Sequence, residues 1–415
     1  MNKEIVIIGG GIMGLCTAYY ALKEGHKVTI VDQSNMDQGA SYVNAGYLSP
    51  SHIIPLSAPG VMKQGIRWMF NKSSPLYIKP RLNVDFIRWT LAFNRSCNAK
   101  HVERSAPIIR DIAVWSQRLY EDIRKTEGFS FHYEKKGLFM LCQTEKMLEK
   151  EAKVIALAND LGLEASLLDK KGIEKLEPNI GIEALGAAYF KCDHHTTPGE
   201  FMAELKTYLE QNGVTFLRHE KVVDLSMEQK RITALATSKR QLKADNFVLA
   251  AGSWSNFLSK KIGLTLLLQA GKGYRINTKN PTGIRIPAIL AEAKCAVTPM
   301  NGFTRFAGTM EIAGIQSKIN PIRVEAIAQS VQRYYPELEI TAQEKKAAAC
   351  GLRPVSPDGL PYIGVSSKCS NLVVATGHAM MGWSMGAATG KLVSEIISEK
   401  KPSLDLSPYH PDRKF

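Results

Sequence analysis

Three glycines near the N-terminus have the spacing of a dinucleotide-binding loop. Gly9, Gly11 and Gly14 follow a β-branched run and open a helical pattern that Gly25 closes. The first glycine permits a tight turn, the second lets a pyrophosphate approach the backbone, and the third lets helix and strand pack closely. The helix start then supplies amide donors to phosphate. Asp32 ends the next apolar run, where a carboxylate accepts ribose hydroxyls, so we expect a bound dinucleotide.

The segment after Asp32 bears on the choice between NAD and FAD. Residues 39–46 read Gly-Ala-Ser-Tyr-Val-Asn-Ala-Gly and are mostly small or carry an amide. A loop of this kind suits a chain that threads past the pyrophosphate towards a flavin ring. Taken alone, the segment would be read as an ordinary turn-rich loop.

Two segments near the C-terminus extend the pattern. Residues 350–364 include Gly351-Leu352-Arg353-Pro354, and residues 376–390 include Gly377-His378 and three further glycines. With the N-terminal loop, these segments resemble the D-amino-acid oxidase (DAO) superfamily of FAD enzymes, and within it the bacterial D-amino-acid dehydrogenases. Shorter matches spread this resemblance over nearly the whole chain; they lie at 44–46, 58–60, 68–70, 250–254 and 272–274.

The resemblance implies an α/β fold with two interwoven domains. One is a Rossmann-like FAD-binding domain of the glutathione-reductase type, formed by residues 1–50, 196–262 and 350–415. The other is an inserted substrate domain, a mixed-sheet α+β unit formed by residues 51–195 and 263–349. The hydrophobic pattern agrees, with strands and helices at 4–8, 27–31, 83–95, 105–126, 137–142, 145–161, 201–211, 247–252, 321–335 and 371–375.

The motifs and the resemblance together give a set of candidate FAD-binding residues. The flavin is expected beneath the start of the final helix, whose positive dipole end would stabilise the charge of reduced flavin. Close helix packing is the alternative role of Gly382, Gly386 and Gly390. The set comprises Gly9, Gly11, Ile12, Met13, Gly14, Asp32, Gln33, Ser41, Asn44, Ala45, Gly46, Val222, Val223, Ala251, Gly252, Trp254, Arg353, Gly377, His378, Met381, Gly382, Trp383 and Ser384.

Arg353 is the first candidate for binding substrate. A guanidinium can hold an amino-acid carboxylate with two parallel hydrogen bonds and so fix Cα–H over flavin N5. The resemblance gives this arginine the same role, and a structural salt bridge is the alternative. Tyr274 would add a hydroxyl to the carboxylate, as family members often have a tyrosine there or nearby. His52 could face the substrate or be an ordinary polar loop residue.

These residues predict FAD-dependent oxidative deamination of D-amino acids. A hydride would pass from Cα to the flavin, and the imino acid would hydrolyse in water. The expected electron acceptor is a quinone or another member of a respiratory chain. Alternatives are a D-proline or D-hydroxyproline dehydrogenase, a glycine- or sarcosine-type oxidase that uses oxygen, and a non-catalytic FAD-containing protein. Cys350 lies near where some sarcosine oxidases tether flavin, but the dehydrogenase-like pattern also carries it, so we expect non-covalent FAD.

Composition limits the remaining possibilities. The chain has 415 residues and no apolar run long enough to cross a membrane. We read the first apolar run as a buried strand rather than a signal peptide, because Glu4 and glycines interrupt it. Seven scattered cysteines without a C-x-x-C pair favour reduced thiols in the cytoplasm and argue against a metal site.

The net charge of +14 raises the question of an anionic partner. No Lys/Arg-rich run of nucleic-acid type occurs. The densest basic stretch, residues 63–95, is mixed with aromatics such as Trp68, Phe70 and Trp89. Such a stretch can dock on anionic lipid headgroups, which would place a cytoplasmic protein peripherally on the inner face of the membrane. A solvated helix face with aromatics turned inward is the alternative.

Overall fold

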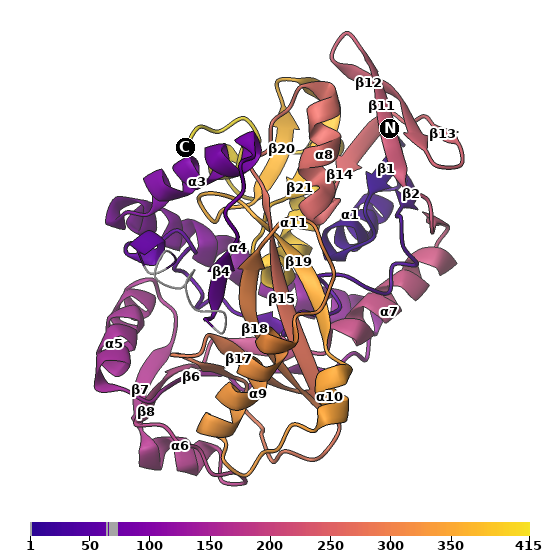
Figure 1. The fold of residues 1–415 in the computed structure, drawn as a ribbon. Helices are drawn as coiled ribbons and strands as arrows, with labels where there is room; N and C mark the ends of the chain where they lie inside the picture. The colour runs from indigo at the N-terminus through magenta and orange to yellow at the C-terminus, as the bar shows by residue number, and fades with distance from the viewer. Residues whose placement is uncertain (1, 64, 66–73) are drawn as a thin grey trace.

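A computed structural model describes residues 2–63, 65 and 74–415 and contains two large β-sheets with helices packed around them (Figure 1). The first sheet has six strands in the order β10-β2-β1-β14-β21-β20. All its pairs are parallel except the last, between β20 and β21. Its strands are β1 (Glu4–Ile8), β2 (Lys27–Val31), β10 (Thr215–Leu217), β14 (Asn246–Leu249), β20 (Tyr362–Ser366) and β21 (Cys369–Thr376).

The first sheet starts with the β-α-β unit that the sequence predicts. Four of the five residues of β1 are buried, as expected for a parallel strand covered on both faces. Helix α1 (Ile12–Lys23) follows, and Gly25 after it has a φ of 82°, the left-handed conformation of a helix C-terminus. The phosphate loop therefore lies at the carboxyl end of a central strand.

The second sheet is mixed and larger. Its order is β19-β15-β18-β17-β16-β6-β8-β7, and β4 pairs with β18. Helix α9 (Pro321–Tyr334) packs against β15 and β18, while α5 (Glu145–Asp160) packs against β7 and β8. The strands are β4 (Leu76–Ile78), β6 (Leu138–Cys142), β7 (Ala165–Asp169), β8 (Gly186–Phe190), β15 (Gln269–Thr278), β16 (Ala288–Leu290), β17 (Cys295–Met300), β18 (Phe303–Ile312) and β19 (Ala349–Val355).

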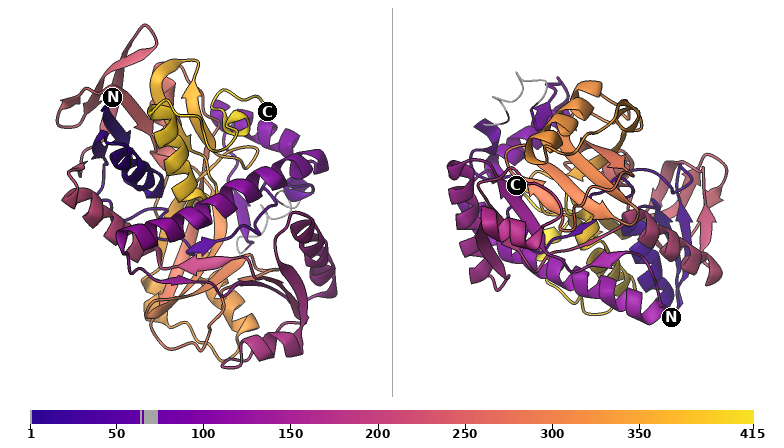
Figure 2. Two further views of the ribbon diagram at one scale, coloured as in Figure 1. Left: turned by 180° about the vertical axis from the view of Figure 1, so that it is seen from behind. Right: turned by 90° about the horizontal axis from the view of Figure 1, so that it is seen from below.

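The other elements connect or cover these sheets. Figure 2 shows the long helix α4 (Ala99–Glu127) running behind the molecule and crossing α11 (Gly382–Ile397). The remaining helices are α3 (Val84–Ser96), α6 (Lys170–Leu176), α7 (Pro198–Gln211), α8 (Ser255–Ser259), α10 (Ala342–Lys346), η1 (Gly252–Trp254), η2 (Lys260–Ile262) and η3 (Ser407–Tyr409). Two small sheets contain β3 (Tyr47–Leu48), β5 (Tyr133–Glu134) and β9 (His194–Thr196), and β11 (Val222–Glu228), β12 (Arg231–Thr237) and β13 (Gln241–Leu242).

Helices α1 and α11 cross at very short range because glycines line the contact. A Cβ on Gly390 would lie 2.4 Å from the Cys16 carbonyl carbon, and one on Gly386 would lie 2.7 Å from Ile12 Cγ1. Close helix packing is therefore the role of these two glycines. A Cβ on Gly382 would make only ordinary contacts, the nearest at 3.4 Å.

The α/β fold with a second, mixed sheet is confirmed. The first sheet takes strands from three separated parts of the chain, and the predicted domain boundaries stay a prediction. Ala349–Val355 pairs with β15 and so belongs to the second sheet, from which we propose that the third FAD-binding segment starts after Val355. Helix α4 begins at Ala99, earlier than the predicted 105. Of the basic aromatic stretch, residues 64 and 66–73, with Arg67, Trp68, Met69, Phe70 and Lys72, lie outside the described residues.

Candidate active site

The phosphate loop has the geometry that its glycines predict. Gly9 has a φ of 110°, and a Cβ on Gly14 would lie 1.9 Å from the Gly9 carbonyl oxygen, so both positions require glycine. Helix α1 starts at Ile12 without a side-chain cap. In the described part of the chain, the Met13 and Gly14 amides donate to no acceptor. The start of α1 thus offers free donors and a positive dipole end to a phosphate.

Asp32 anchors this loop. Its Oδ2 accepts a hydrogen bond of 2.8 Å from the Gly10 amide, and its Oδ1 accepts from the amide and hydroxyl of Ser34. Carboxylate oxygens have further lone pairs, so a ribose hydroxyl can still donate to Asp32. Gln33 beside it is exposed. The predicted ribose contact remains a prediction.

The segment 39–46 links the phosphate loop to the second sheet. Ser41 Oγ accepts a hydrogen bond of 3.0 Å from the Ile12 amide, which holds the segment at the start of α1. Further along, Arg305 Nη1 donates to the carbonyls of Tyr42 and Asn44 at 2.9 and 2.6 Å. Asn44 Oδ1 accepts from the Gly46 amide. The path therefore runs from the start of α1 towards the second sheet, and the predicted approach to the flavin ring stays a prediction.

Gly46 and Ala45 complete this turn. Gly46 has a φ of 79°, and a Cβ there would lie 2.2 Å from the Thr196 carbonyl oxygen. The next residue, Tyr47, donates its hydroxyl to the carbonyls of Ala288 and Val297 at 2.8 and 2.9 Å. Sequence reasoning missed Tyr47, whose only signal was its place after the Asn-Ala-Gly run.

The start of α11 resembles that of α1. Neither helix has a side-chain N-cap, whereas α3, α4, α5 and α9 are capped by an Asn or Thr side chain. Gly377 has a φ of 86°, and a Cβ there would lie 2.8 Å from the Tyr362 ring. Met381 is the N-cap residue and Gly382 the first residue of α11. The backbone here leaves an open helix start for a negatively charged group.

Three neighbouring side chains serve the protein's own packing. His378 Nε2 pairs with Thr389 Oγ1 at 2.9 Å, and burial lowers the His378 pKa to about 3. Trp383 donates its indole N–H to Thr196 Oγ1. Ser384 donates to the Tyr47 carbonyl. Any contact of these residues with a cofactor would therefore come from their backbone.

The carboxyl end of β14 completes this edge of the first sheet. A Cβ on Gly9 would lie 2.5 Å from the Ala250 carbonyl oxygen, so the two strand ends are in contact. Ala251 and Gly252 follow directly, and Trp254 is partly exposed beyond them. At the start of β11, Val222 is buried and Val223 exposed, since successive strand residues point to opposite sides.

Arg353 lies on a bare face of the second sheet. A Cβ on Gly273 would lie 2.1 Å from Arg353 Nη1, so the guanidinium covers that glycine. Strand alternation and register define the residues of this front face, as we call it: Gly271, Gly273, Arg275 and Asn277 of β15, Arg305 and Ala307 of β18, and Gly351 and Arg353 of β19. Segment 39–46 lies over part of it, because a Cβ on Gly351 would meet Val43 and Ala40 at 2.4 and 2.8 Å.

A β-bulge sets the position of the Arg353 guanidinium. The register of β15 and β18 shifts between Lys272 and Tyr274, and Thr309 in the bulge has a φ of 58°. A positive φ is strained for a β-branched residue, and such strain concentrates at functional sites. The Thr309 carbonyl accepts a hydrogen bond of 3.2 Å from Arg353 Nη1. Burial lowers the Arg353 pKa to about 10, so it stays charged at neutral pH.

Tyr274 is not where the substrate prediction requires it. It lies on the opposite face, the back face, which carries Lys272, Tyr274 and Ile276 of β15, Phe306 of β18 and Cys350 of β19. Its hydroxyl donates to Glu311 Oε2 at 2.8 Å, and Glu311 also pairs with Lys272. Because adjacent strand residues point to opposite sides, Tyr274 and Arg353 cannot share one carboxylate. We correct this prediction.

His52 is held in a different part of the site. Its Nδ1 is buried without a partner in the described chain. Burial and the nearby Lys294 lower its pKa to about 4, so the ring is neutral. Lys294 lies between β16 and β17, three to four strands from β19, or roughly 14–19 Å. The structure therefore places His52 in the interior without bringing it to Arg353.

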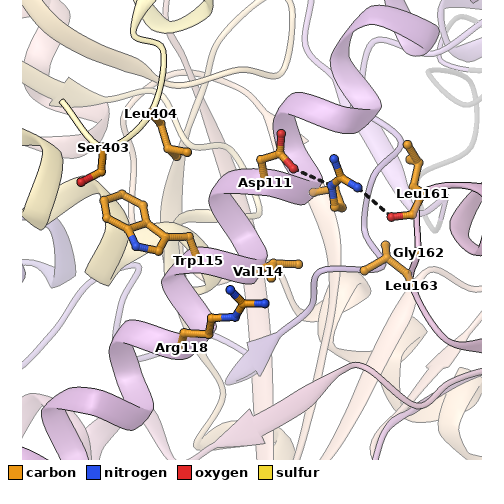
Figure 3. Close-up of a pocket in the computed structure, with 10 residues that line it drawn as sticks. Asp111, Val114, Trp115, Arg118, Leu161, Gly162, Leu163, Ser403 and Leu404 are labelled. Carbon is orange, nitrogen blue, oxygen red and sulfur yellow. Dashed lines mark hydrogen bonds and ion pairs between the residues drawn. The ribbon is translucent and has the colours of Figure 1, made fainter.

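Another pocket, of about 580 Å³, is separate from these residues (Figure 3). It is formed by one side of α4 and by residues 161–163 and 403–404. Arg110 there pairs with Asp111 and donates to the Leu161 carbonyl. None of the candidate FAD-binding residues lines this pocket. Among residues 2–63, 65 and 74–415, no three His, Cys, Asp or Glu side chains are grouped as metal ligands.

The arrangement fits the predicted FAD. Two uncapped helix starts, at α1 and α11, can bind a pyrophosphate and the negative side of a flavin. Glycines on the front face let other parts of the chain approach the sheet closely: the Arg353 guanidinium covers Gly273, and Ala40 and Val43 lie over Gly351. The site can therefore hold a dinucleotide cofactor against a carboxylate-binding arginine.

Known proteins share this organisation. Residues 4–396 match the DAO family, described as FAD dependent oxidoreductase. D-amino acid dehydrogenases of Granulibacter bethesdensis and Agrobacterium fabrum are 30% and 31% identical to this chain over 411 and 410 residues, and each match covers 97% of both chains. Glycine oxidase from Geobacillus kaustophilus has a similar structure, with a TM-score of 0.80 at 21% identity over 100% of this chain and 99% of its own. L-proline dehydrogenase from P. horikoshii gives 0.73 at 19% identity over 99% and 97%.

The family match covers nearly the whole chain and includes both sheets. The chain therefore belongs to the DAO family of FAD-dependent oxidoreductases, and FAD is its cofactor.

Proposed function

We propose that this protein is a D-amino acid dehydrogenase. The observation that carries the proposal is the Arg353 guanidinium, which lies on the bare front face with no acidic partner in the described chain. Arginine has five N–H donors, so Arg353 retains donors for a substrate carboxylate after its bond to the Thr309 carbonyl. The relatives named D-amino acid dehydrogenase support this class of substrate.

The chain's own residues would orient the substrate rather than exchange protons with it. Arg353 would hold the α-carboxylate, and Gly273 beneath it leaves space for the guanidinium. When bound, FAD accepts a hydride from the substrate Cα. The uncapped start of α11 would favour negative charge next to it. His52 and His378 have lowered pKa values and stay neutral at physiological pH, so an amine entering deprotonated needs neither as a base.

Other reactions of the family remain alternatives within this proposal. A cyclic substrate such as D-proline or D-hydroxyproline would use the same arginine, and an oxidase would pass electrons to oxygen. The Cys350 thiol donates to the Ser317 carbonyl on the back face, away from Arg353, which favours non-covalent FAD. Acid precipitation should then release the flavin into the supernatant.

The test compares the wild-type protein with Arg353→Leu. Anaerobic mixing with D- and L-amino acids, sarcosine and hydroxyproline isomers should bleach the wild-type flavin with D-amino acids. The variant should bind FAD normally and show KM raised at least about 100-fold, since a bidentate charged contact is lost. Unchanged KM would refute the role of Arg353. Reoxidation by oxygen or by a quinone analogue separates oxidase from dehydrogenase.

A specific surface supports peripheral membrane contact near a quinone acceptor. Phe86, Trp89 and Phe93 of α3 are buried, which matches the alternative in which aromatics turn inward. The other side of the helix nevertheless exposes Val84, Ile87 and Leu91 at 47–63%, and Leu82 before it is fully exposed. Arg88 and Arg95 are also on α3. No helix in the described chain is long and apolar enough to span a membrane.

We propose that this α3 stripe (Leu82, Val84, Ile87 and Leu91) docks on an anionic lipid surface. Wild-type protein should sediment with phosphatidylglycerol vesicles at low salt more than with phosphatidylcholine vesicles. The triple change of Leu82, Ile87 and Leu91 to Ser should abolish this binding. Leu167→Ser with Leu185→Ser, at exposed sites elsewhere, is the matched control. Equal sedimentation of all three proteins would refute the docking surface.

A further inference from the structure

Arg275 is a half-buried cation on the front face that the described chain leaves without a partner. It lies on β15 two residues from Gly273, the glycine that the Arg353 guanidinium covers. No hydrogen bond or ion pair joins it to any described residue, and its Nε is buried and unsatisfied. Burial lowers its pKa. Leaving a buried donor without an acceptor is costly, so the position calls for an explanation.

The residues paired with Arg275 on the neighbouring strands are small, while segment 39–46 lies over the nearby Gly351 and bonds to Arg305. In the sheet register it faces Ala307 of β18 on one side and Ala349 of β19 on the other, both too small to cover a guanidinium. Arg305, diagonally across, is a second cation. It donates only to neutral acceptors, the carbonyls of segment 39–46 and Asn277. The nearby buried Glu311 lies on the back face, where Tyr274 and Lys272 bind it.

The front face thus holds uncompensated positive charge next to the arginine that is proposed to bind the substrate. Two residues along a strand separate the Gly273 and Arg275 Cα atoms by roughly 6.7 Å. Long arginine side chains on this scale can hold the two carboxylates of one small dicarboxylic molecule. A neutral side chain in the same place would leave the Arg275 donors unpaired, which is how sites discriminate strongly between polar substrates.

We propose that Arg275 is a specificity-determining residue that binds the side-chain carboxylate of an acidic D-amino acid, D-glutamate or D-aspartate. This inference rests on the proposed function, in which Arg353 binds the α-carboxylate. Arg275 sets which amino acid is preferred, and Arg353 is required for all of them. The wild-type protein should therefore favour D-glutamate over its neutral isostere D-glutamine by about 100-fold or more in kcat/KM.

The first test measures this preference in Arg275→Gln. The ratio of kcat/KM for D-glutamate to that for D-glutamine should fall to within about threefold of unity, mainly through KM for the acid. Lys279→Gln removes an exposed charge just beyond the same strand and is the matched control, with its ratio unchanged. A wild-type ratio near unity, or an unchanged ratio in Arg275→Gln, would overturn the inference and leave the D-amino acid dehydrogenase proposal standing.

The second test needs no turnover. Glutarate has two carboxylates and no amine, so its binding can be followed as a perturbation of the flavin spectrum of the holoenzyme. Arg275→Gln should weaken glutarate binding at least about 10-fold and leave butyrate binding unchanged. If no D-amino acid bleaches the flavin, the proposed function fails, yet glutarate still tests Arg275. Loss of FAD from Arg275→Gln would assign the residue to the cofactor and overturn the inference.

Discussion

The two faces of the second sheet are built from the same strands and have opposite characters. On the front face, β15 and β19 present glycines and arginines: Gly271, Gly273, Arg275, Gly351 and Arg353. On the back face, the intervening residues of β15 are Lys272, Tyr274 and Ile276. Tyr274 and Ile276 join a hydrophobic core with α9, and Lys272 pairs with Glu311.

This difference shows that the two faces of one strand can have separate roles, structural support on one face and ligand binding on the other. On the back face, three buried polar groups pair with one another: Glu311 accepts from Tyr274 and pairs with Lys272. On the front face, glycines replace side chains, and Arg275 has no partner within the described chain. A face with unpaired cations suits an anionic ligand, while a face with paired groups holds the sheet in shape.

The sharpest way to break the comparison is to fill the front face. Gly273→Ala would place a Cβ 2.1 Å from Arg353 Nη1 and displace the guanidinium, which is a flexible side-chain end. We expect kcat/KM to fall by roughly 100-fold, because small misplacements of positioning groups have such effects. Steady-state kinetics with flavin content as a control measure this.

Gly271→Ala is the matched control on the same face. Its Cβ would meet the side chains of Val355 and Met310 at 2.9 and 3.3 Å, and its three nearest contacts include no Arg353 atom. It should lower the melting temperature and leave KM nearly unchanged. Equal kinetic losses in both variants would mean that crowding of the sheet, and not the position of Arg353, limits activity.

A second prediction concerns the buried Asp193, which is hydrogen-bonded to Ser51 in the segment that follows Tyr47. Asp193 accepts hydrogen bonds from the amide and hydroxyl of Ser51, and burial raises the Asp193 pKa to about 7. Since this folded-state pKa is above the usual value, the stabilising effect is complete below about pH 4 and is lost as pH rises towards 7.

Asp193→Asn should remove this pH dependence. Between about pH 4 and 7 the wild-type free energy of unfolding should lose roughly 4 kcal/mol from this group, whereas the variant should lack that loss. Urea unfolding at several pH values measures it. Parallel pH profiles for the two proteins would show that folding does not shift the Asp193 pKa.

The smallest effect is expected on the back face. Tyr274→Phe removes the hydroxyl that donates a hydrogen bond to Glu311, while the ion pair between Glu311 and Lys272 remains. Stability should fall by about 1–2 kcal/mol, and kcat/KM should stay within about twofold of wild type. Chemical denaturation and kinetics together test this. A large rise in KM would restore Tyr274 to the substrate site and remove the distinction between the faces.

Local patterns predicted the first sheet well. A β-branched run, three glycines and a following Asp act within one β-α-β unit, so their meaning does not depend on distant residues. The role proposed for Arg353 also comes from a local pattern, because its motif lies on a single strand. Gly386 and Gly390 were ambiguous in the sequence because helix packing and cofactor contact both favour glycine.

The errors came from tertiary context. Tyr274 was placed by type and proximity in sequence, but strand alternation turns it to the back face once β15 and β19 pair in the observed register. Helix α4 starts earlier than the predicted 105 because Asn98 caps it, and Pro107 lies inside the helix. Arg275 belongs to no motif. Only the strand pairing of β15 in the structure shows that it lacks a partner in the described chain.

The order of strands in the first sheet has a consequence for synthesis on the ribosome. Ile5 pairs with Asn246, and Phe247 in turn pairs with Leu372. Helices α1 and α11, whose starts are open, pack on each other at Cys16 and Gly390. The nascent N-terminal β-α-β unit must therefore wait, with an incomplete cofactor site, until α11 has emerged. Domains with such distant partners fold slowly, so FAD loading should be a late, post-translational event.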